Sequence, residues 1–111
     1  MKSHQNIDQR AIALAQHIVA RIDRDPQRDG LKKARLTCRH WQRILTGREK
    51  ACADEWALIL EKPWQEVRSI LLDSGSEAIR LRQNNPFCGV LSNQERWKIM
   101  KEFYQYDTRA A

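Results

Sequence analysis

Five basic residues recur at the three- and four-residue spacing of a helix face. They are Arg28, Lys32, Arg35, Arg39 and Arg43. At about 100° per residue these positions fall within about 80° of one another, away from the apolar stripe of the same segment. The nearby acids, Asp25 and Asp29, belong to the first turn, where the helix dipole favours negative charge. We expect an exposed cationic face for an acidic protein surface or for nucleic-acid phosphates, and the bland alternative is a solvated helix surface.

Two histidines raise the possibility of acid–base chemistry. Arg10-x6-His17 and Arg35-x4-His40 resemble the R-x4-6-H pattern of HEPN-type ribonucleases, which are helical and whose His serves in acid–base cleavage. Such spacings arise easily by chance, because the chain holds thirteen Arg. Neither match has the usual polar residue after the arginine. We therefore do not expect an enzyme, and a HEPN-like ribonuclease ranks third among the functions considered.

The cysteines do not predict a metal site. Cys38, Cys52 and Cys88 are odd in number and lack C-x-x-C spacing, which favours free thiols in a reducing compartment. On a helix, Cys38 and His40 project about 200° apart and cannot close on one ion. We expect no metal and no cofactor, with Cys38 in the core and Cys88 packed in a buried loop.

Charge is distributed unevenly along the 111 residues, whose net charge is +6. Residues 1–50 hold twelve Lys or Arg against five acids, whereas residues 51–111 hold eight against nine. The positive field therefore belongs to the N-terminal half and suits an anionic partner. No apolar run has the length of a signal-peptide core or a membrane span. We expect one cytoplasmic domain, 1–111, with frayed ends at 1–5 and 107–111.

The basic row requires a helix to position it, and apolar periodicity predicts two longer helices in the first half. The first runs from about 6 to 24 and ends at Asp25-Pro26, a pair that also suits the start of the second helix. The second carries the basic row, and its inward stripe is Leu31, Ala34, Cys38, Trp41 and Leu45. Gly47 is expected to close it in the left-handed conformation, followed by a polar link at 47–50.

Four shorter helices are expected in the second half. The third spans about 51–61, the fourth opens after Pro63, and the fifth spans about 76–83 with Ser74 and Glu77 as an S-x-x-E cap. The sixth follows Ser92. The predicted fold class is all-α: a small bundle of about six helices, with an N-terminal helical hairpin and shorter helices closing over one end.

The segment 87–91 between the last two helices is called the elbow. Pro86 should end the arriving helix, and Ser92 with Glu95 should form a capping box for the next one. The elbow is too apolar for a solvated loop, so we expect it to fold against the body with Trp97, Met100 and Phe103 behind it.

Four tryptophans fall on predicted inward faces: Trp41, Trp56, Trp64 and Trp97. A chain of this size does not easily bury four indoles, so we expect one or two aromatic residues to anchor an interface. The candidates for that role are Phe87 and Trp97.

The second half of the chain resembles a group of small bacterial helical proteins. The pattern L-R-Q-x-x-P-F-x-G-[IV]-L-[ST]-x-x-E-R-W is matched by Leu81-Arg82-Gln83, Pro86-Phe87, Gly89-Val90-Leu91-Ser92 and Glu95-Arg96-Trp97. A preceding P-W-x-x-[VI]-x-x-[IL]-L-L run is matched by Pro63-Trp64, Val67 and Ile70-Leu71-Leu72. The resemblance implies a member of a two-gene module, similar to an antitoxin beside a nucleotidyltransferase-like partner. It carries over no catalytic residue, because the motif consists of caps, turns and aromatic anchors.

The sequence therefore favours a non-catalytic binding protein, antitoxin-like, that docks on the product of a neighbouring gene. The alternative is a nucleic-acid-binding module that uses the basic row on phosphates. A membrane partner is not expected.

Overall fold

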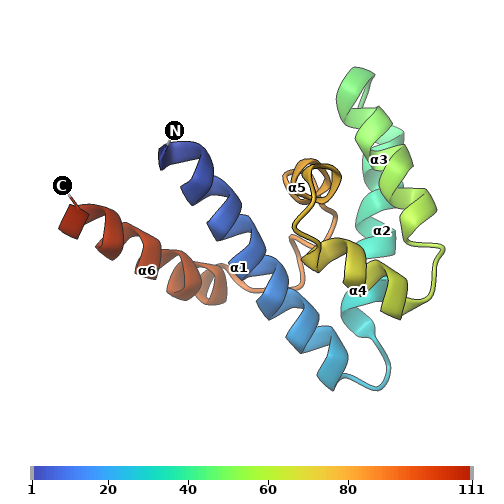
Figure 1. Cartoon of the computed structure of the whole chain (residues 1–111). Coiled ribbons are helices and arrows are strands. Elements are labelled where there is room, and N and C mark those ends of the chain that lie inside the picture. Colours follow the sequence, from blue (N-terminus) through green and yellow to red (C-terminus); the bar gives the residue numbers. More distant parts are fainter. Residues whose placement is uncertain (1, 111) are drawn as a thin grey trace.

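Six helices form most of the described backbone (Figure 1). They are α1 (Lys2–Arg24), α2 (Asp29–Ile44), α3 (Gly47–Ile59), α4 (Trp64–Leu72), α5 (Ser76–Arg82) and α6 (Asn93–Ala110). The computed structural model describes the backbone of residues 2–110 and the side chains of residues 8–103, and that part contains no strand. The predicted all-α bundle is confirmed. Within the described residues, no helix combines the length and the apolar character that crossing a bilayer requires.

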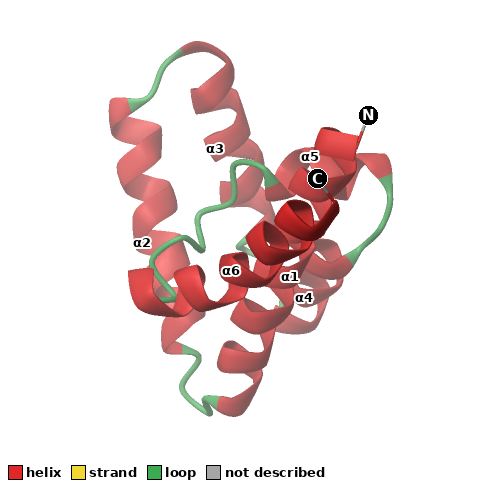
Figure 2. Cartoon of the chain, turned by 90° about the vertical axis from the view of Figure 1, so that its left-hand side faces the viewer, coloured by secondary structure: helices red, strands yellow, loops and turns green. Residues whose placement is uncertain are grey.

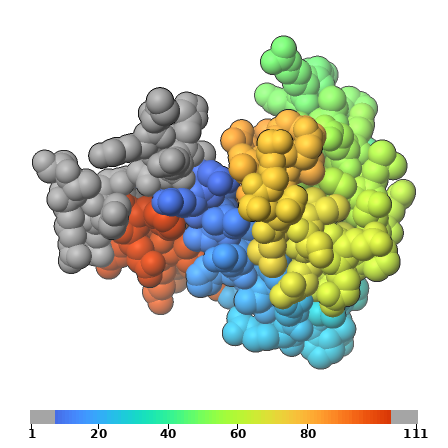
Figure 3. All heavy atoms as spheres, in the orientation of Figure 1, coloured from blue at the N-terminus to red at the C-terminus, as the bar shows by residue number. Residues whose placement is uncertain are grey.

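Helix α1 lies at the centre of the arrangement and contacts α2, α4, α5 and α6. Figure 1 shows it running diagonally between α6 and the pair formed by α2 and α3. In the space-filling view, α4 and α5 lie between α1 and α3 (Figure 3). Figure 2 shows the loop between α5 and α6 reaching across to α2, where Lys33 Nζ donates to the Gly89 carbonyl at 3.4 Å. The elbow is therefore held against the body of the protein.

The core is centred on Trp56 and Phe87, which are both fully buried. Their ring centroids are 6.0 Å apart at an interplanar angle of 74°, the edge-to-face arrangement that aromatic pairs prefer. Trp56 Nε1 donates to the Leu81 carbonyl at 3.1 Å, which satisfies the polar atom of the indole. The predicted packing of the elbow is confirmed for Phe87 and Leu91. The prediction that Phe87 anchors an interface is wrong, because other core residues already cover its ring.

The capping box predicted before α6 is present. The Glu95 N–H donates to Ser92 Oγ at 3.1 Å, and the Ser92 N–H donates to Glu95 Oε1 at 2.9 Å. The S-x-x-E cap predicted from Ser74 and Glu77 is not formed, because Gly75 takes the N-cap position of α5, where no side chain makes a capping hydrogen bond. The helix begins one residue too late for Ser74 to reach its amides.

Helix α2 begins at Asp29, so the predicted start at Asp25-Pro26 is wrong. Asp25 instead closes a turn: its carboxylate accepts the Gln27 N–H at 3.0 Å and the Asp29 N–H at 2.8 Å. Arg28, the N-cap residue, adopts the left-handed conformation with φ 54°. Asp25 therefore satisfies the first amide of α2 from outside the helix.

Gly47 has the predicted positive φ, 62°, but it opens α3 and does not close α2. Leu45 and Thr46 are both extended and form the whole connection between the two helices. The polar link predicted at 47–50 is therefore helical, because two residues suffice to reverse the chain.

Three arginines donate to carbonyl oxygens at the ends of other helices. The pairs are Arg28 Nη1 with Ile22 at the end of α1 (2.9 Å), Arg35 Nε with Leu60 after α3 (3.1 Å) and Arg82 Nη1 with Leu71 at the end of α4 (2.9 Å). The last carbonyls of a helix lack intrahelical donors and carry partial negative charge. Each guanidinium therefore caps a helix to which it does not belong.

The expected fraying at 1–5 and 107–111 stays a prediction. Met1, Ala111 and the side chains of these two ends lie outside the described residues.

Candidate functional site

The basic row predicted on α2 is divided in two by the structure. Arg28 and Arg35 are half-buried and cap α1 and α3, and the Arg28 guanidinium also lies 6.0 Å from the centroid of the Trp64 ring. The prediction that all five residues are exposed is wrong for these two, because carbonyl groups of neighbouring helices hold them. Lys32, Arg39 and Arg43 remain exposed.

The three exposed cations have little to neutralise them. Lys32 Nζ is 3.9 Å from Asp29 Oδ1, and both side chains are well exposed, so this ion pair contributes little. Arg39 and Arg43 form no hydrogen bond or ion pair with any described residue. Their charge can therefore act on a partner.

Two exposed leucines accompany these cations. Leu36 is 62% exposed and precedes Arg39 by three positions and Arg43 by seven, so it shares their side of α2. Leu58, on α3, is 66% exposed. Neither leucine was predicted from the sequence. Leu36 was identifiable, because its position falls beside the basic row and off the apolar stripe.

A groove of about 770 Å³ runs between α2 and α3, with Arg39 and Leu58 among its lining residues. Asp54 also lines it and accepts from Gln42 Nε2 at 2.9 Å and from Lys50 Nζ at 3.0 Å. These two hydrogen bonds, from Gln42 first and then from Lys50, lower the pKa of Asp54. Asp54, one of two carboxylates that line the groove with Glu61, is therefore ionised and already matched, whereas Arg39 forms no hydrogen bond or ion pair with a described residue.

We call the side chains of Lys32, Leu36, Arg39, Arg43 and Leu58 the α2–α3 surface. Its cations and exposed leucines have the character of a binding face. No protein-family model, curated protein or solved structure matches this chain. A functional proposal must therefore rest on the α2–α3 surface itself.

The two histidines of the ribonuclease hypothesis are both exposed. Neither His17 nor His40 forms a hydrogen bond with a described residue. Arg35, which the spacing pattern pairs with His40, instead donates to the Leu60 carbonyl. Acid–base catalysts are normally held by a second group, so the described residues provide no geometric support for this hypothesis. Groups of three or more His, Cys, Asp or Glu that could hold a metal ion are likewise missing from the described part.

The cysteines differ in their surroundings. Cys38 is buried as predicted, its Sγ donates to the Ala53 carbonyl at 3.2 Å, and burial raises the pKa of its thiol. Cys88 is exposed, so the prediction that it is buried is wrong. The elbow turns Phe87 into the core, which leaves the next residue on the outside.

Trp97 is 59% exposed, although it was predicted to pack behind the elbow. Met100 and Phe103, farther along α6, are half-buried. Glu95 and Arg96, directly before Trp97, are half-buried as well, so Trp97 lies on the outward face of α6, and the prediction that it packs behind the elbow is wrong. Its role as an interface anchor stays a prediction.

Proposed function

We propose that this protein is a non-catalytic binding protein whose α2–α3 surface docks on an acidic patch of a partner protein. The observation that carries the proposal is the position of Leu36 and Leu58 beside Arg39, a cation that no described residue neutralises. Protein interfaces bury apolar side chains beside arginines that pair with the partner. A phosphate backbone offers no apolar surface to two leucines.

The partner is proposed to be the product of a neighbouring gene, with this chain as an antitoxin-like accessory protein. The supporting observation is the resemblance of the second half of the chain to such proteins, together with the excess positive charge in residues 1–50. Charge complementarity of this kind increases the association rate and selects against positively charged competitors.

Nucleic acid is the second candidate partner, because Lys32, Arg39 and Arg43 lie exposed along one helix. Three phosphate contacts would give a slope of about −2.7 in a plot of log affinity against log salt concentration. This slope is shallow, so nucleic-acid binding through the helix alone would be weak at physiological salt.

The test is the affinity of the purified protein for the purified neighbouring gene product, measured by calorimetry. We expect Arg39→Glu/Arg43→Glu to weaken binding by at least about tenfold, because charges complementary to the partner become repulsive. Leu36→Ala should weaken it through lost burial. The matched control is Arg48→Glu/Lys101→Glu, which changes the net charge equally at exposed positions off the α2–α3 surface.

Equal losses in the charge variant and in its control would mean that only net charge matters, and the proposed surface would be wrong. A parallel titration with random-sequence DNA and RNA at several salt concentrations separates the second candidate. Loss of nucleic-acid affinity in Arg39→Glu/Arg43→Glu, with no binding to the protein partner, would favour that candidate.

A further inference from the structure

The groove between α2 and α3 has walls of opposite charge. On the α2 side lies Arg39, which forms no hydrogen bond or ion pair with a described residue through its side chain. On the α3 side lie the carboxylates of Asp54 and Glu61, of which Glu61 is exposed and likewise has no partner among the described residues. Ala57 and Leu58 give this side an apolar lining. An acidic side chain of a partner is therefore attracted to the α2 wall and repelled from the α3 wall.

Three exposed side chains follow one another along α2: Leu36, Arg39 and Arg43. Their spacing of three and four residues corresponds to about 4.5 and 6 Å along the helix axis, within about 60° of one face. A partner helix that lies along α2 has the same rise per residue. It can therefore present one apolar residue and two acids from a single face, at its positions n−3, n and n+4. In an extended segment the residues of one face repeat about every 6.8 Å, which does not fit the first spacing.

The groove offers little backbone hydrogen bonding to an extended segment. Its walls are two helices, whose backbone groups bond mainly within each helix, and the described part of the chain has no strand edge that a partner strand could join. The N–H and C=O groups of an extended partner would be covered there without a match, whereas a helix satisfies these groups internally. A helix is therefore the partner element that the groove accommodates best.

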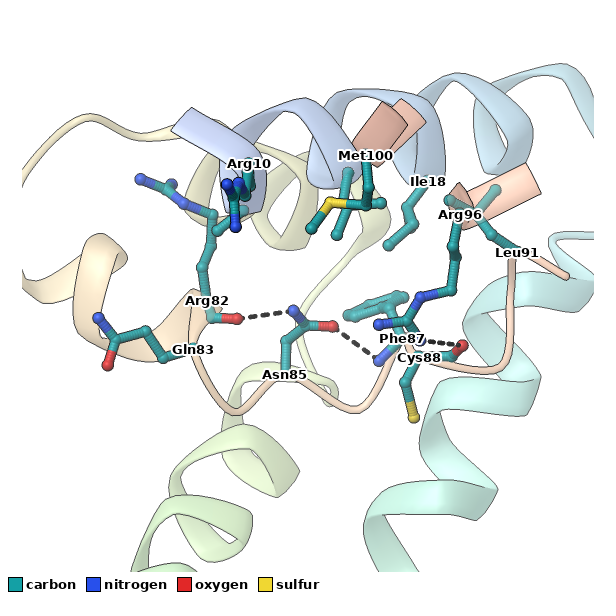
Figure 4. A pocket seen from close by; sticks show the side chains of 12 residues that line it. Arg10, Ile18, Arg82, Gln83, Asn85, Phe87, Cys88, Leu91, Arg96 and Met100 are labelled. Carbon is teal, nitrogen blue, oxygen red and sulfur yellow. Dashed lines mark hydrogen bonds between the residues drawn. The ribbon is translucent and has the colours of Figure 1, made fainter. Parts of the chain in front are cut away.

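The pocket between α1, α6 and the elbow differs from this groove, because polar groups beside it bind within the protein (Figure 4). Asn85 Nδ2 donates to the Arg82 carbonyl at 2.8 Å, and Asn85 Oδ1 accepts the Phe87 N–H at 2.9 Å. Arg96 Nη1 donates to the Cys88 carbonyl at 3.3 Å. These contacts hold the loop between α5 and α6 in place and do not indicate a partner.

We propose that the acidic patch recognised by the α2–α3 surface is one face of an amphipathic helix of the partner protein. This helix lies along α2, with two acids against Arg39 and Arg43 and an apolar residue against Leu36. Other apolar residues of the helix cover Leu58, and its flank beside Glu61 is neutral or basic. The inference rests on the proposed function and adds the kind of structural element that the partner supplies.

The test titrates the wild-type protein with two peptides of identical composition, each held helical by the same hydrocarbon staple. The matched peptide has Leu at n−3, Glu at n and n+4, and Gln at n+2 and n+6. The control peptide exchanges the Glu and Gln residues, which moves each acid about 200° around the helix. We expect calorimetry to show that the matched peptide binds at least about tenfold more tightly, because the control forms neither ion pair. The matched peptide should also shift the amides of Arg39, Arg43 and Leu58.

A charge exchange tests the pairing directly. The variant Arg39→Glu/Arg43→Glu should reverse the preference and bind a third peptide, with Lys at n and n+4, at least about tenfold more tightly than the matched peptide. The control variant Arg48→Glu/Lys101→Glu has the same net charge but changes exposed positions off the α2–α3 surface, so it should keep the preference of wild type. Circular dichroism of both variants verifies the fold. The same reversal in the control variant would overturn the proposal, because net charge alone would then explain it.

Equal affinity of wild type for the matched and control peptides would also overturn the proposal, and this comparison requires no variant. The outcome for the proposed function is separate. If the peptides bind equally but the neighbouring gene product still loses affinity in Arg39→Glu/Arg43→Glu, docking through the surface stands and the helical partner element is wrong. If the gene product does not bind but the peptides show the expected reversal, the preference for an acidic helix stands and the neighbouring gene product is the wrong partner.

Discussion

Replacing Arg82 with methionine tests whether burial or the number of hydrogen bonds determines the contribution of an arginine to stability. The Arg82 side chain is almost fully buried and donates to the carbonyls of Leu71 at 2.9 Å and Asp73 at 2.5 Å. Methionine keeps the packing of the aliphatic stem but provides no donor. The Leu71 carbonyl, which accepts in a buried environment, would then lose the Arg82 donor.

The expected loss follows from two opposing terms. An orphaned buried acceptor costs about 1–3 kcal/mol. The carbonyl of exposed Asp73 can be hydrated instead, and so can the carboxylate of Asp8, which is ion-paired with Arg82 and 35% exposed. Removing the buried charge recovers part of its desolvation penalty. We expect Arg82→Met to lower the free energy of unfolding by about 2 kcal/mol, or the melting temperature by roughly 8 °C.

Arg80 is the matched control, two residues away on the same helix. Its guanidinium bonds to the carboxylates of Glu55 and Glu77, and these two, Glu55 first, raise its pKa. Because the side chain is exposed, water replaces most of what Arg80→Met removes. Chemical denaturation of both variants decides the question. A larger loss for Arg80→Met than for Arg82→Met would refute the reasoning from burial.

Two further predictions follow from titratable groups. The hydrogen bond from Trp64 Nε1, and then Arg68, hold the pKa of Asp23 below its ordinary value of 3.8. The stabilisation is therefore complete above that value and is lost as the pH falls through the folded-state pKa. The stability difference between wild type and Asp23→Asn should therefore be constant from about pH 6 to about pH 4 and shrink as the pH falls further to about pH 2. A difference that stays constant over the whole range would contradict this. In the native protein a maleimide reagent should modify Cys88 rapidly and Cys38 only after unfolding, because burial raises the pKa of the Cys38 thiol. The variant Cys88→Ser should lose the fast phase of modification. Equal modification rates at the two thiols would contradict the prediction.

Local signals in the sequence predicted most of the helices. The capping box at Ser92 was predictable because both of its hydrogen bonds join residues three positions apart. Pro63 was another local signal: it indicated the start of α4, and in the structure it is the N-cap residue of that helix. At Ser74 the signal failed because Gly75, which is also an acceptable N-cap residue, occupies that position in the structure.

The different fates of Arg35 and Arg39 were not predictable from the sequence. Both belong to one helical row, but the acceptor of Arg35 is the Leu60 carbonyl, 25 positions away on another element. Helical periodicity gives the direction of a side chain relative to its own helix and says nothing about which helix end lies there. The candidate site was therefore predicted as a row of five cations, of which the structure leaves three exposed.

The division of the basic row into two arginines that cap helices and three exposed cations helps to distinguish the two candidate partners, a protein and a nucleic acid. If all five cations contacted phosphates, the slope of log affinity against log salt concentration would be about −4.5, compared with about −2.7 for three. Engaging Arg28 or Arg35 would require their guanidinium groups to leave the carbonyls at the ends of α1 and α3, at a cost to the fold. A protein partner needs no such change, because the side chains of Leu36, Arg39 and Leu58 are already exposed. Docking on a protein thus uses the surface as it stands, whereas tracking phosphates along the whole row would require the protein to give up two helix caps.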